Sequence, residues 1–537
     1  MTRRISLSRD ALLGLTALYL ATVLNAAFYR AAMQATAVLD PYPWVFMISL
    51  PFFLFFVLLF VLNLVYLPYI GRTLVALLIL ISAAAGYASF TYGILFDYDM
   101  MQNIAQTHYG EAASYLNARS ITAWLFLGAI PAGLLLLCSP RRLGVAGWLT
   151  SQLRVALISI VGISVIAGAF YEEYAVIGRN NRQLKSYIIP TQMGWSGYRY
   201  AKKNLFAAPH IHESIGLDSH HARLTKARLL VMVLGETARS QSFAYSGYER
   251  NTNPYTTAIP GMQFMETLSC GTATAVSVPC MFSSMDKAHY DADQAGYQDN
   301  VLDVINRGGT QVTWIDNDGG CKGICNRIKT IQITHSADDP LCTDQSCYDE
   351  VLLRELDAQL ADDSDEDRLI VLHTIGSHGP TYFQRYPVSH REFSPDCPRS
   401  DIQNCSTEAL VNTYDNTIAY TDYILAGVVD RLKALESRYT TSMMYMSDHG
   451  ESLGESGIYL HGLPYFLAPE EQTHVPTLIW LSDDMNQSLG VHDLCLQAVA
   501  GQAPYTQDYL FHSLLRLTGT ETSIYMPELD IFNHCHS

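Results

Sequence analysis

Three residues that could bind a metal ion follow two short hydrophobic runs of the chain. Glu236 comes just after the run 228–234, and Asp448 and His449 come after the run 442–446. In a parallel sheet the chemistry gathers beyond the carboxyl ends of the strands, so these side chains are expected to converge there. Carboxylate oxygens and imidazole nitrogens are the ligands that a divalent cation needs. Together the three residues predict a metal site.

A nucleophile is expected in the stretch CGTATAVSVPC, residues 270–280. A small bridged loop of this kind can hold one hydroxyl rigidly while its backbone N–H groups face an anion. Thr272, Thr274 and Ser277 are all candidates on chemistry alone. The alternative interpretation is an exposed, threonine-rich turn.

Two histidines and a lysine have neighbours that favour a role at this site. His378 and His461 are each followed by a glycine, which permits close approach of a ligand. Histidine titrates near the operating pH, so either ring could give a proton to a leaving oxygen or take one from an acceptor. Lys322 lies between Cys321 and Cys325, and a disulfide there would fix its direction. Each residue alone is more often a packed polar group or a solvated charge.

Residues 211–537 are expected to form the domain that positions these groups. Short β-type runs alternate there with helical patterns, which predicts an α/β domain with a central, largely parallel sheet. The expected strands are 228–234, 311–315, 369–374, 442–446 and 474–481. The expected helices between them include 300–307, 349–360 and 410–435.

Residues 1–175 are predicted to be a five-helix transmembrane domain. A helix needs about 20 predominantly apolar residues to cross a bilayer. Five runs are long enough, near 11–29, 44–67, 73–95, 121–138 and 155–174. Buried helices of a soluble protein are disfavoured, because five successive runs carry so little charge. Residues 176–210 mix basic and aromatic side chains and are expected to be an interfacial linker.

The arginines predict the orientation, because cytoplasmic loops retain positive charge. Seven arginines fall on one side of the predicted spans: Arg3, Arg4, Arg9, Arg72, Arg141, Arg142 and Arg154. Only Arg30 and Arg119 fall on the other side. The N-terminus is therefore expected in the cytoplasm, and an odd number of spans places residues 176–537 outside, in a bacterial periplasm or an equivalent space. The chain is expected to be a multi-pass protein of the bacterial inner membrane.

The cysteines support an oxidising compartment. Of eleven, ten lie beyond residue 175, and most are close to a partner in sequence. The expected pairs are Cys270 with Cys280, Cys321 with Cys325, Cys342 with Cys347, and Cys397 with Cys405. A fifth pair of Cys495 with Cys535 is left open, since sequence does not assign connectivity. Zinc ribbons are disfavoured because no pair of CxxC knuckles is present.

Composition excludes two classes of protein. With 49% hydrophobic and 16% charged residues the chain is not disordered. Its formal charge of −17 gives no sign of a nucleic-acid partner.

The outer loop 97–119 carries Asn103, Thr107 and Glu111 at i, i+4 and i+8, so a helix would place them on one face. A solvated loop face is the alternative there.

Several long stretches resemble one family. They are GETARSQSFAYSGY, SCGTATAVSVPCMFS, DNDGGCKGIC, HTIGSHGPTYFQRYP, LVNTYDNTIAYTD and SDHGESLGESGIYLHG. These stretches resemble the membrane-bound phosphoethanolamine transferases that modify lipid A and reduce polymyxin and colistin binding. Five spans followed by a periplasmic domain of the alkaline phosphatase and sulfatase type also match that family, over essentially the whole chain.

The resemblance implies roles for individual residues. Thr274 is the nucleophile, and Glu236, Thr274, Asp448 and His449 hold a catalytic Zn²⁺. His378 and His461 line the substrate site, where a second zinc is an open question. The residues implied to contact the phosphatidylethanolamine headgroup are Asn103, Thr107, Glu111, Asp318, Lys322, His378 and His461. Asp318 stands where some relatives carry Asn, and Gly319 where some carry Ser.

The implied reaction moves phosphoethanolamine from phosphatidylethanolamine to a lipid A phosphate through a covalent intermediate on Thr274, with release of diacylglycerol. A zinc-bound hydroxyl would be activated as zinc-bound water is, whose pKa falls from 15.7 to about 7. The enzyme is expected to act as a monomer. One alternative is a transferase of glycerol phosphate or with another glycan acceptor on the same fold. Another is a metal-free membrane sensor.

Overall fold

The computed structural model describes most of the chain, and its contacts divide it into two units. The described residues are 7–36, 43–107, 109–138, 143–171, 173–174, 177, 181–206, 211–336, 338–343, 346–362, 364–491, 495–496 and 505–535. The first unit is Met1–Gln102 with Leu116–Ala207, and the second is Asn103–Tyr115 with Ala208–Ser537. Four arginines of the orientation argument, Arg3, Arg4, Arg141 and Arg142, lie outside the described residues.

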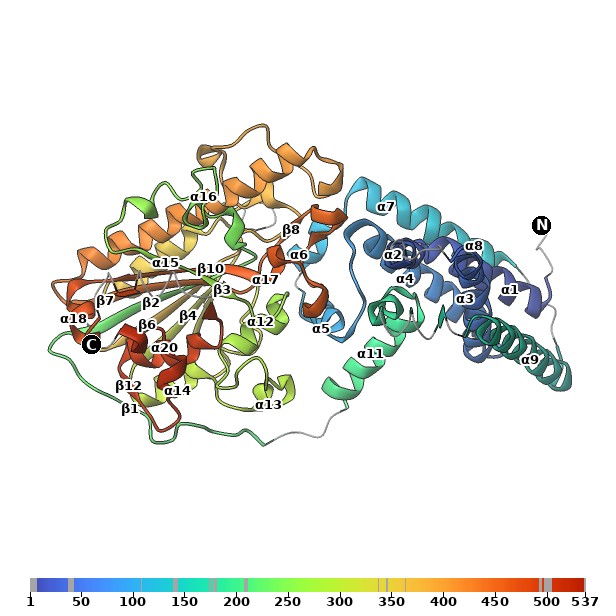
Figure 1. Ribbon diagram of the computed structural model, residues 1–537, viewed down its shortest axis with the longest axis horizontal. Coiled ribbons are helices and arrows are strands. Elements are labelled where there is room, and N and C mark those ends of the chain that lie inside the picture. Colours follow the sequence, from blue (N-terminus) through green and yellow to red (C-terminus); the bar gives the residue numbers. More distant parts are fainter. Residues whose placement is uncertain are drawn as a thin grey trace. The chain divides into compact units, whose positions relative to one another are not determined.

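The first unit is a bundle of long apolar helices (Figure 1). Four helical segments of the described chain are long and apolar enough to cross a membrane, and a bent pair makes up to five. The four are α3 (Trp44–Val65), α4 (Gly71–Tyr92), the segment Ala118–Leu137 and α9 (Val145–Ala169). Ala118–Leu137 consists of α7 (Ala118–Trp124), a π-turn (Leu125–Ala129) and α8 (Ile130–Leu137). This agrees with the membrane domain expected from the sequence.

The bent pair stands where the first span is expected, near 11–29. Helix α1 (Arg9–Tyr19) continues through a π-turn to Leu24, and α2 (Ala26–Thr36) leaves at an angle of 53°. The break is at Asn25, which is fully buried. Its side-chain amide donates to the carbonyls of Leu20 and Ile189, and its side-chain oxygen accepts from the Ile189 N–H. Asn25 thus satisfies backbone groups that a bend exposes.

A buried polar cluster explains why α9 begins ten residues before the expected start at 155. Arg9 is 3% exposed, and its guanidinium donates to Ser151 Oγ at 3.0 Å and to Asn63 Oδ1 at 2.8 Å. It also donates to Gln152 Oε1 at 2.9 Å. These contacts tie Ser151 and Gln152, in the second turn of α9, to the start of α1, and of these two Ser151 is buried.

The second unit contains an eight-stranded sheet with the order β11-β3-β10-β7-β2-β6-β4-β5. Five neighbouring strands are parallel: β7 (Tyr439–Ser447), β2 (Ala227–Gly235), β6 (Arg368–His373), β4 (Gln311–Asp316) and β5 (Lys329–Gln332). Strand β10 (His474–Leu481) is antiparallel to β7 and to β3 (Gln263–Leu268), and β11 (Tyr505–Thr506) is parallel to β3. The predicted largely parallel sheet is confirmed.

Helices cover both faces of this sheet, as Figure 1 shows. On one face lie α15 (Glu350–Leu360) and α16 (Thr407–Ala434), and on the other α14 (Val301–Gly308) and α20 (Tyr509–Thr518). Strands β2, β6 and β7 are therefore buried along nearly their whole length. Continuous apolar runs are typical of parallel strands covered on both faces.

The remaining described elements are short. The helices are α5 (Tyr98–Gln106), α6 (Tyr109–Ser114), α11 (Thr191–Asn204), α12 (Thr274–Met281), α13 (Ala292–Tyr297), α17 (Glu470–Thr473) and α18 (Asp483–Leu489). Two-stranded sheets pair β1 (His220–His221) with β12 (Thr520–Glu521) and β8 (Ser452–Leu453) with β9 (Tyr459–Leu460).

Five disulfides brace the second unit. They join Cys270 with Cys280, Cys321 with Cys325, Cys342 with Cys347, Cys397 with Cys405, and Cys495 with Cys535. The last pair settles the pairing that the sequence left open.

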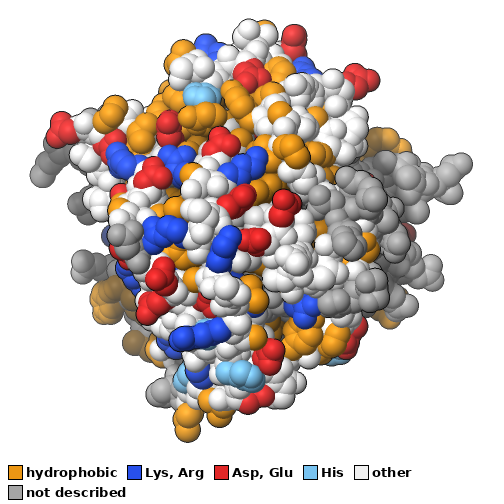
Figure 2. Space-filling model, turned by 90° about the vertical axis from the view of Figure 1, so that its left-hand side faces the viewer, with side chains coloured by type: hydrophobic (Ala, Val, Ile, Leu, Met, Phe, Trp, Pro, Cys, Tyr) orange, Lys and Arg blue, Asp and Glu red, His pale blue; other side chains and the backbone are white. Residues whose placement is uncertain are grey.

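On the face of the molecule drawn in Figure 2, acidic and basic side chains are interspersed among the described residues rather than gathered by sign.

Candidate active site

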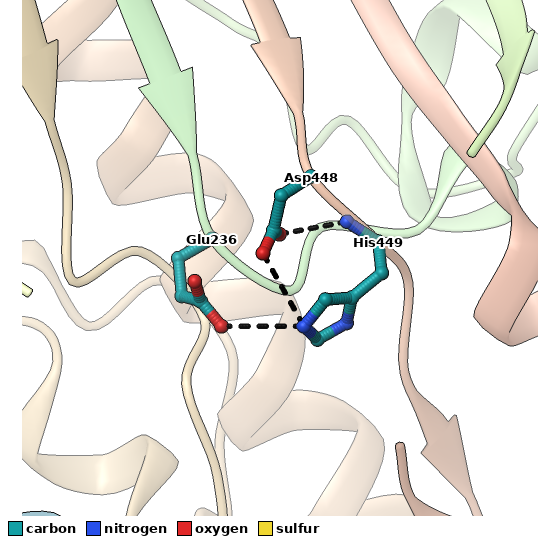
Figure 3. Close-up of side chains that lie close together, drawn as sticks. All are labelled: Glu236, Asp448 and His449. Carbon is teal, nitrogen blue, oxygen red and sulfur yellow. Dashed lines mark hydrogen bonds and ion pairs between the residues drawn. The ribbon is translucent and has the colours of Figure 1, made fainter. Parts of the chain in front are cut away.

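The candidate site lies where β2 and β7 end side by side. Gly235 and Ser447 are partners in the parallel register, so Glu236 and Asp448 follow at the same level of the sheet. A Cβ at position 235 would come within 2.5 Å of the Tyr445 ring, so only glycine fits before Glu236. The predicted convergence of Glu236, Asp448 and His449 is observed (Figure 3).

All three side chains are fully buried, and their ligand atoms lie within 4.8 Å of one another. His449 Nε2 is 3.5 Å from Glu236 Oε1 and 3.3 Å from Asp448 Oδ2. His449 Nδ1 lies 3.0 Å from the Gly450 carbonyl, which can only accept, so Nδ1 carries the proton and Nε2 a lone pair. Metal-binding histidines are commonly oriented in this way.

A cation fits this cluster for a reason visible in its contacts. Asp448 Oδ2 is buried and accepts no hydrogen bond from the described residues, and it faces the unprotonated His449 Nε2. Two electron-rich atoms in a dry site repel each other unless a positive charge lies between them. The other carboxylate oxygen, Oδ1, accepts from the backbone N–H groups of Thr237 and His449. The donor set is therefore suited to a divalent cation such as zinc.

Electrostatics agree with that fit. Burial raises the pKa of Glu236 well above its ordinary value, and the charges of Asp448 and Asp318 raise it further, against smaller opposing effects of Thr237 and Lys322. Burial lowers the pKa of His449, which keeps the imidazole neutral. A bound cation would offset the cost of burying these carboxylates.

The three candidate hydroxyls of the sequence differ in their surroundings. Thr274, the first residue of α12, has its Oγ1 3.1 and 3.2 Å from the Glu236 carboxylate oxygens and 3.3 Å from His449 Nε2. Thr272 donates to the Leu463 carbonyl, and Ser277 accepts from the Gly271 N–H at 2.9 Å. The disulfide between Cys270 and Cys280 closes the loop around Thr274. Of the three hydroxyls, Thr274 is the one that faces the predicted metal ligands.

The two predicted histidines lie beside this cluster. The His461 ring centroid is 4.4 Å from that of His449 and 5.7 Å from that of His378. Glu451 Oε2 contacts His461 Nδ1 at 2.8 Å, and the Tyr382 hydroxyl donates to Glu451 Oε1. A row of imidazoles therefore leads away from Thr274, and a buried carboxylate orients its middle member.

Lys322 and Asp318 lie on a loop that follows β4. The loop is held by Asp316, whose Oδ1 accepts the N–H groups of Gly319 and Gly320, each at 2.8 Å. Asp316 Oδ2 contacts His373 Nδ1 at 3.0 Å, and His373 Nε2 is 3.8 Å from Asp318 Oδ2. Glu236, Asp318 and His373 also bring one ligand atom each within 4.8 Å.

Asn103, Thr107 and Glu111 would share one face only if one helix carried all three. Helix α5 ends at Gln106 and α6 begins at Tyr109, so that condition is not met. Thr107 lies just past the end of α5, and its hydroxyl donates to the Asn103 carbonyl at 2.9 Å, satisfying a group that the helix end leaves open. The Glu111 side chain lies outside the described atoms. The segment Asn103–Tyr115 packs with the second unit.

Several residues of the site were not singled out from the sequence. They are Thr237, Asp316, His373, Tyr382 and Glu451. A signal for two of them existed, because Asp316 and His373 close the predicted strands at 311–315 and 369–374, as Glu236 and Asp448 follow theirs. Four neighbouring strands, β7, β2, β6 and β4, thus end at or just before an ionisable side chain.

Comparisons with known proteins cover both units. Residues 54–205 match the family model "Phosphoethanolamine transferase EptA/EptB", and residues 228–520 match the family model "Sulfatase". The chain is 41% identical to phosphoethanolamine transferase EptA of Salmonella typhimurium, over 99% of this chain and 98% of the relative. It is 33% identical to phosphatidylethanolamine transferase Mcr-1 of Escherichia coli, over 96% and 95%.

A solved structure agrees over the same length. The integral membrane lipooligosaccharide phosphoethanolamine transferase A of Neisseria meningitidis matches with a TM-score of 0.95 and 34% identity, covering 99% of each chain. Its printed name describes the same combination of a membrane protein and a transferase. With a buried metal-ligand cluster on a sulfatase-type sheet, an apolar helical unit and full-length relatives of one kind, the chain belongs to the phosphoethanolamine transferase family.

Proposed function

We propose that this protein transfers phosphoethanolamine from phosphatidylethanolamine to a phosphate of lipid A, with Thr274 as the nucleophile. The observation that carries the proposal is the position of the Thr274 hydroxyl, 3.1–3.3 Å from Glu236 and His449 inside a buried cluster of metal-ligand type. Membership of the family supports the transferred group, and lipid A is named for a relative, Kdo(2)-lipid A phosphoethanolamine 7''-transferase of Salmonella typhimurium.

The proposed first step forms a covalent adduct. A bond forms between Thr274 Oγ1 and the phosphorus of the donor, and the bond from phosphorus to the glycerol oxygen breaks, which releases diacylglycerol. Thr274 releases its hydroxyl proton to water, and His378 or His461 supplies a proton to the glycerol oxygen. In the second step a lipid A phosphate oxygen attacks the same phosphorus and gives its proton to that histidine, and the bond to Thr274 breaks as the Thr274 oxygen takes a proton from water.

We assign the zinc to Glu236, Thr274, Asp448 and His449, whose side chains meet in the buried cluster. Bound zinc would supply Lewis-acid chemistry, favouring the ionised form of a coordinated hydroxyl and countering charge on the phosphoryl oxygens. The chain's own contribution is to hold Thr274 at the start of α12, with its Oγ1 against Glu236 and His449. Whether a second zinc binds at His378 and His461 stays open.

Positive charge near the reacting group comes from Lys322. Lys322 lowers the pKa of Glu236 slightly, against the larger effect of burial, and the Cys321–Cys325 disulfide closes the loop that carries it. We propose that Lys322 and Asp318 contact the donor headgroup, the first at phosphate and the second at the ammonium. Asn103, Thr107 and Glu111 are proposed to complete that contact.

We place the first unit in the bacterial inner membrane and the second in the periplasm. Five disulfides support an oxidising compartment. Arg9 and Arg72 lie in the first turns of α1 and α4, and Arg154 of α9 pairs with Asp10 beside Arg9, so all three lie on the side that the arginine rule assigns to the cytoplasm. Both substrates are lipids, so tethering confines the enzyme to the surface where they are found and raises the effective concentration. We expect the enzyme to act as a monomer.

Reconstitution tests the proposal. The purified full-length protein in vesicles of phosphatidylethanolamine with lipid A should add phosphoethanolamine to lipid A, read by mass spectrometry. Thr274→Ala should abolish the addition with folding preserved. Thr272→Ala removes a neighbouring hydroxyl that bonds the Leu463 carbonyl, so it should lower stability but leave transfer measurable. Replacing the donor by phosphatidylglycerol tests the glycerol phosphate alternative, and transfer from that lipid alone would contradict the proposal.

A further inference from the structure

The membrane unit contains an apolar cavity that the proposed chemistry does not use. Its volume is about 440 Å³, within the range of pockets that bind small ligands. Its lining comes from α2, α3 and the residues that follow α9, all within the first unit. The cavity is therefore a feature of that unit alone.

Aromatic rings form one wall of the cavity. The Tyr174 ring lies 5.0 Å from the Phe46 ring and 4.8 Å from the Phe53 ring, measured between centroids. Phe28 and Leu50 complete this part of the lining, and both are buried against the helices of the unit. A wall of this kind offers water few hydrogen-bond partners, so an apolar occupant is favoured.

Three polar lining residues of the cavity come from one segment of the chain. Lys185, Asn181 and Thr191 lie on the segment that follows α9, and all three are lining residues. Lys185 is the one charged side chain among the described residues that line the cavity, and it is exposed. An exposed ammonium among the lining residues of an apolar cavity is complementary to an anionic headgroup on an apolar chain.

The length of the cavity fits one leaflet of a bilayer. Along α3 its lining runs from Phe46, near the helix start, to Val57, near the middle. At 1.5 Å per residue this is roughly 16 Å, and half of a hydrocarbon core is about 15 Å. Lys185 would then lie at the headgroup level of the same leaflet, where basic side chains gather.

We propose that this cavity binds one acyl chain of a glycerophospholipid, with the lipid phosphate at Lys185. The occupant is a lipid of the surrounding bilayer, because the apolar wall and the length suit an acyl chain, and the exposed ammonium suits the phosphate carried by the same glycerol. The site is separate from the headgroup contacts proposed above, and it does not depend on the Thr274 chemistry.

Photolabelling of the full-length protein tests the proposal. The protein is reconstituted in nanodiscs that contain phosphatidylethanolamine with a diazirine near the middle of one acyl chain, and labelled peptides are mapped by mass spectrometry. Labelling is expected on α3 and on the peptide that contains Tyr174. Leu50→Trp fills the cavity and should reduce this labelling roughly tenfold. Phe52→Trp, on the exposed side of the same helix, is the matched control and should leave it unchanged.

A charge reversal tests the position of the headgroup. Lys185→Glu should reduce the cavity labelling several-fold, whereas Lys202→Glu, on an exposed lysine outside the lining, should not. Equal labelling in the wild type and in Leu50→Trp would show ordinary contact with bulk lipid and would overturn the proposal. A diazirine fatty alcohol, which has no phosphate, serves as the second probe. If it labels the same peptides as the phospholipid probe does, and Lys185→Glu has no effect, the assignment of a phosphate to Lys185 would be overturned. Because labelling is read instead of transfer, this result is independent of the proposed function.

Discussion

Asp316→Asn is the substitution whose effects can be worked out most fully from the structure. Asp316 is buried and accepts five hydrogen bonds, two of them from the Trp314 indole and the His373 ring at 2.9 and 3.0 Å. The others come from the N–H groups of Gly319 and Gly320 and from Gln332. Burial by itself would raise the pKa of Asp316, but His373 and the other donors outweigh it and hold the pKa well below its ordinary value.

The asparagine keeps the size of the side chain and removes one acceptor. If its NH₂ group takes the place of Oδ2, it faces the N–H groups of Trp314 and His373, which it cannot accept. The two hydrogen bonds from these donors to the charged carboxylate are then lost, and the buried donors stay unpaired. Leaving one buried partner unsatisfied costs about 1–3 kcal/mol, and His373 can recover part of this by changing tautomer. We therefore expect the free energy of unfolding of the catalytic unit to fall by about 3 kcal/mol, and its melting temperature by about 5 °C.

The same change should act on function through the loop that Asp316 holds. With the N–H groups of Gly319 and Gly320 released, Asp318 and Lys322 lose their fixed positions, so the KM for the donor should rise roughly tenfold, as for lost supporting contacts elsewhere. Zinc content should stay the same, because the four proposed ligands are untouched. Thermal unfolding in detergent, metal analysis and steady-state kinetics on one preparation give all three values.

Asp357→Asn is the matched control. Asp357 pairs with Arg431 at 2.7 Å on the surface and is 55% exposed, so its loss should change stability by at most about 1 kcal/mol. If Asp316→Asn shifted the melting temperature and the KM no more than this control, the inference that Asp316 organises the loop would be wrong.

Three further predictions concern pH, a disulfide and the metal. His512 is buried, which lowers its pKa from 6.5 to about 4, and its Nδ1 accepts the Met526 N–H. As the pH falls, the unfolded chain therefore takes up this proton before the folded chain does. The free energy of unfolding present above pH 6.5 should decrease between pH 6.5 and 4, and the melting temperature of His512→Gln should decrease less over that range. An equal decrease in the wild type and the variant would contradict this. Replacing Cys321 and Cys325 together by Ser should lower stability by about 2 kcal/mol and raise the donor KM, and an unchanged KM would argue against a role in directing Lys322. Glu236→Gln should lose zinc by elemental analysis, and full zinc content would remove Glu236 from the ligand set.

The site could be predicted as far as strand ends are visible in sequence. Glu236, Asp448 and His449 follow apolar runs that the structure shows as β2 and β7, so general sheet geometry was enough to group them. Sheet geometry could not choose among Thr272, Thr274 and Ser277, because that choice depends on which hydroxyl already bonds the backbone of the loop or of Leu463. Such bonds join residues far apart in sequence and leave no local pattern.

Partners reached through tertiary contacts were missed for the same reason. Glu451 lies three residues after Asp448, but its role follows from its contact with His461 Nδ1 and from the Tyr382 hydroxyl, neither of which sequence spacing indicates. In the membrane unit, the apolar run near 11–29 predicts a span but not its bend, because the bend depends on buried Asn25, which bonds Ile189, 164 residues away. Strand β3 was not predicted, since its alternating burial is a weak signal beside the continuous runs of β2 and β7.

The central claim is that Thr274 carries phosphoethanolamine covalently between the two lipids. Its most direct test is rapid acid quenching of the reconstituted enzyme with phosphatidylethanolamine labelled in the headgroup and without lipid A, followed by mass spectrometry of the digested protein. The account predicts a phosphoethanolamine adduct on Thr274 that disappears when lipid A is added, as lipid A gains the label. Label that reaches lipid A at full rate while the Thr274 peptide is never modified would contradict it.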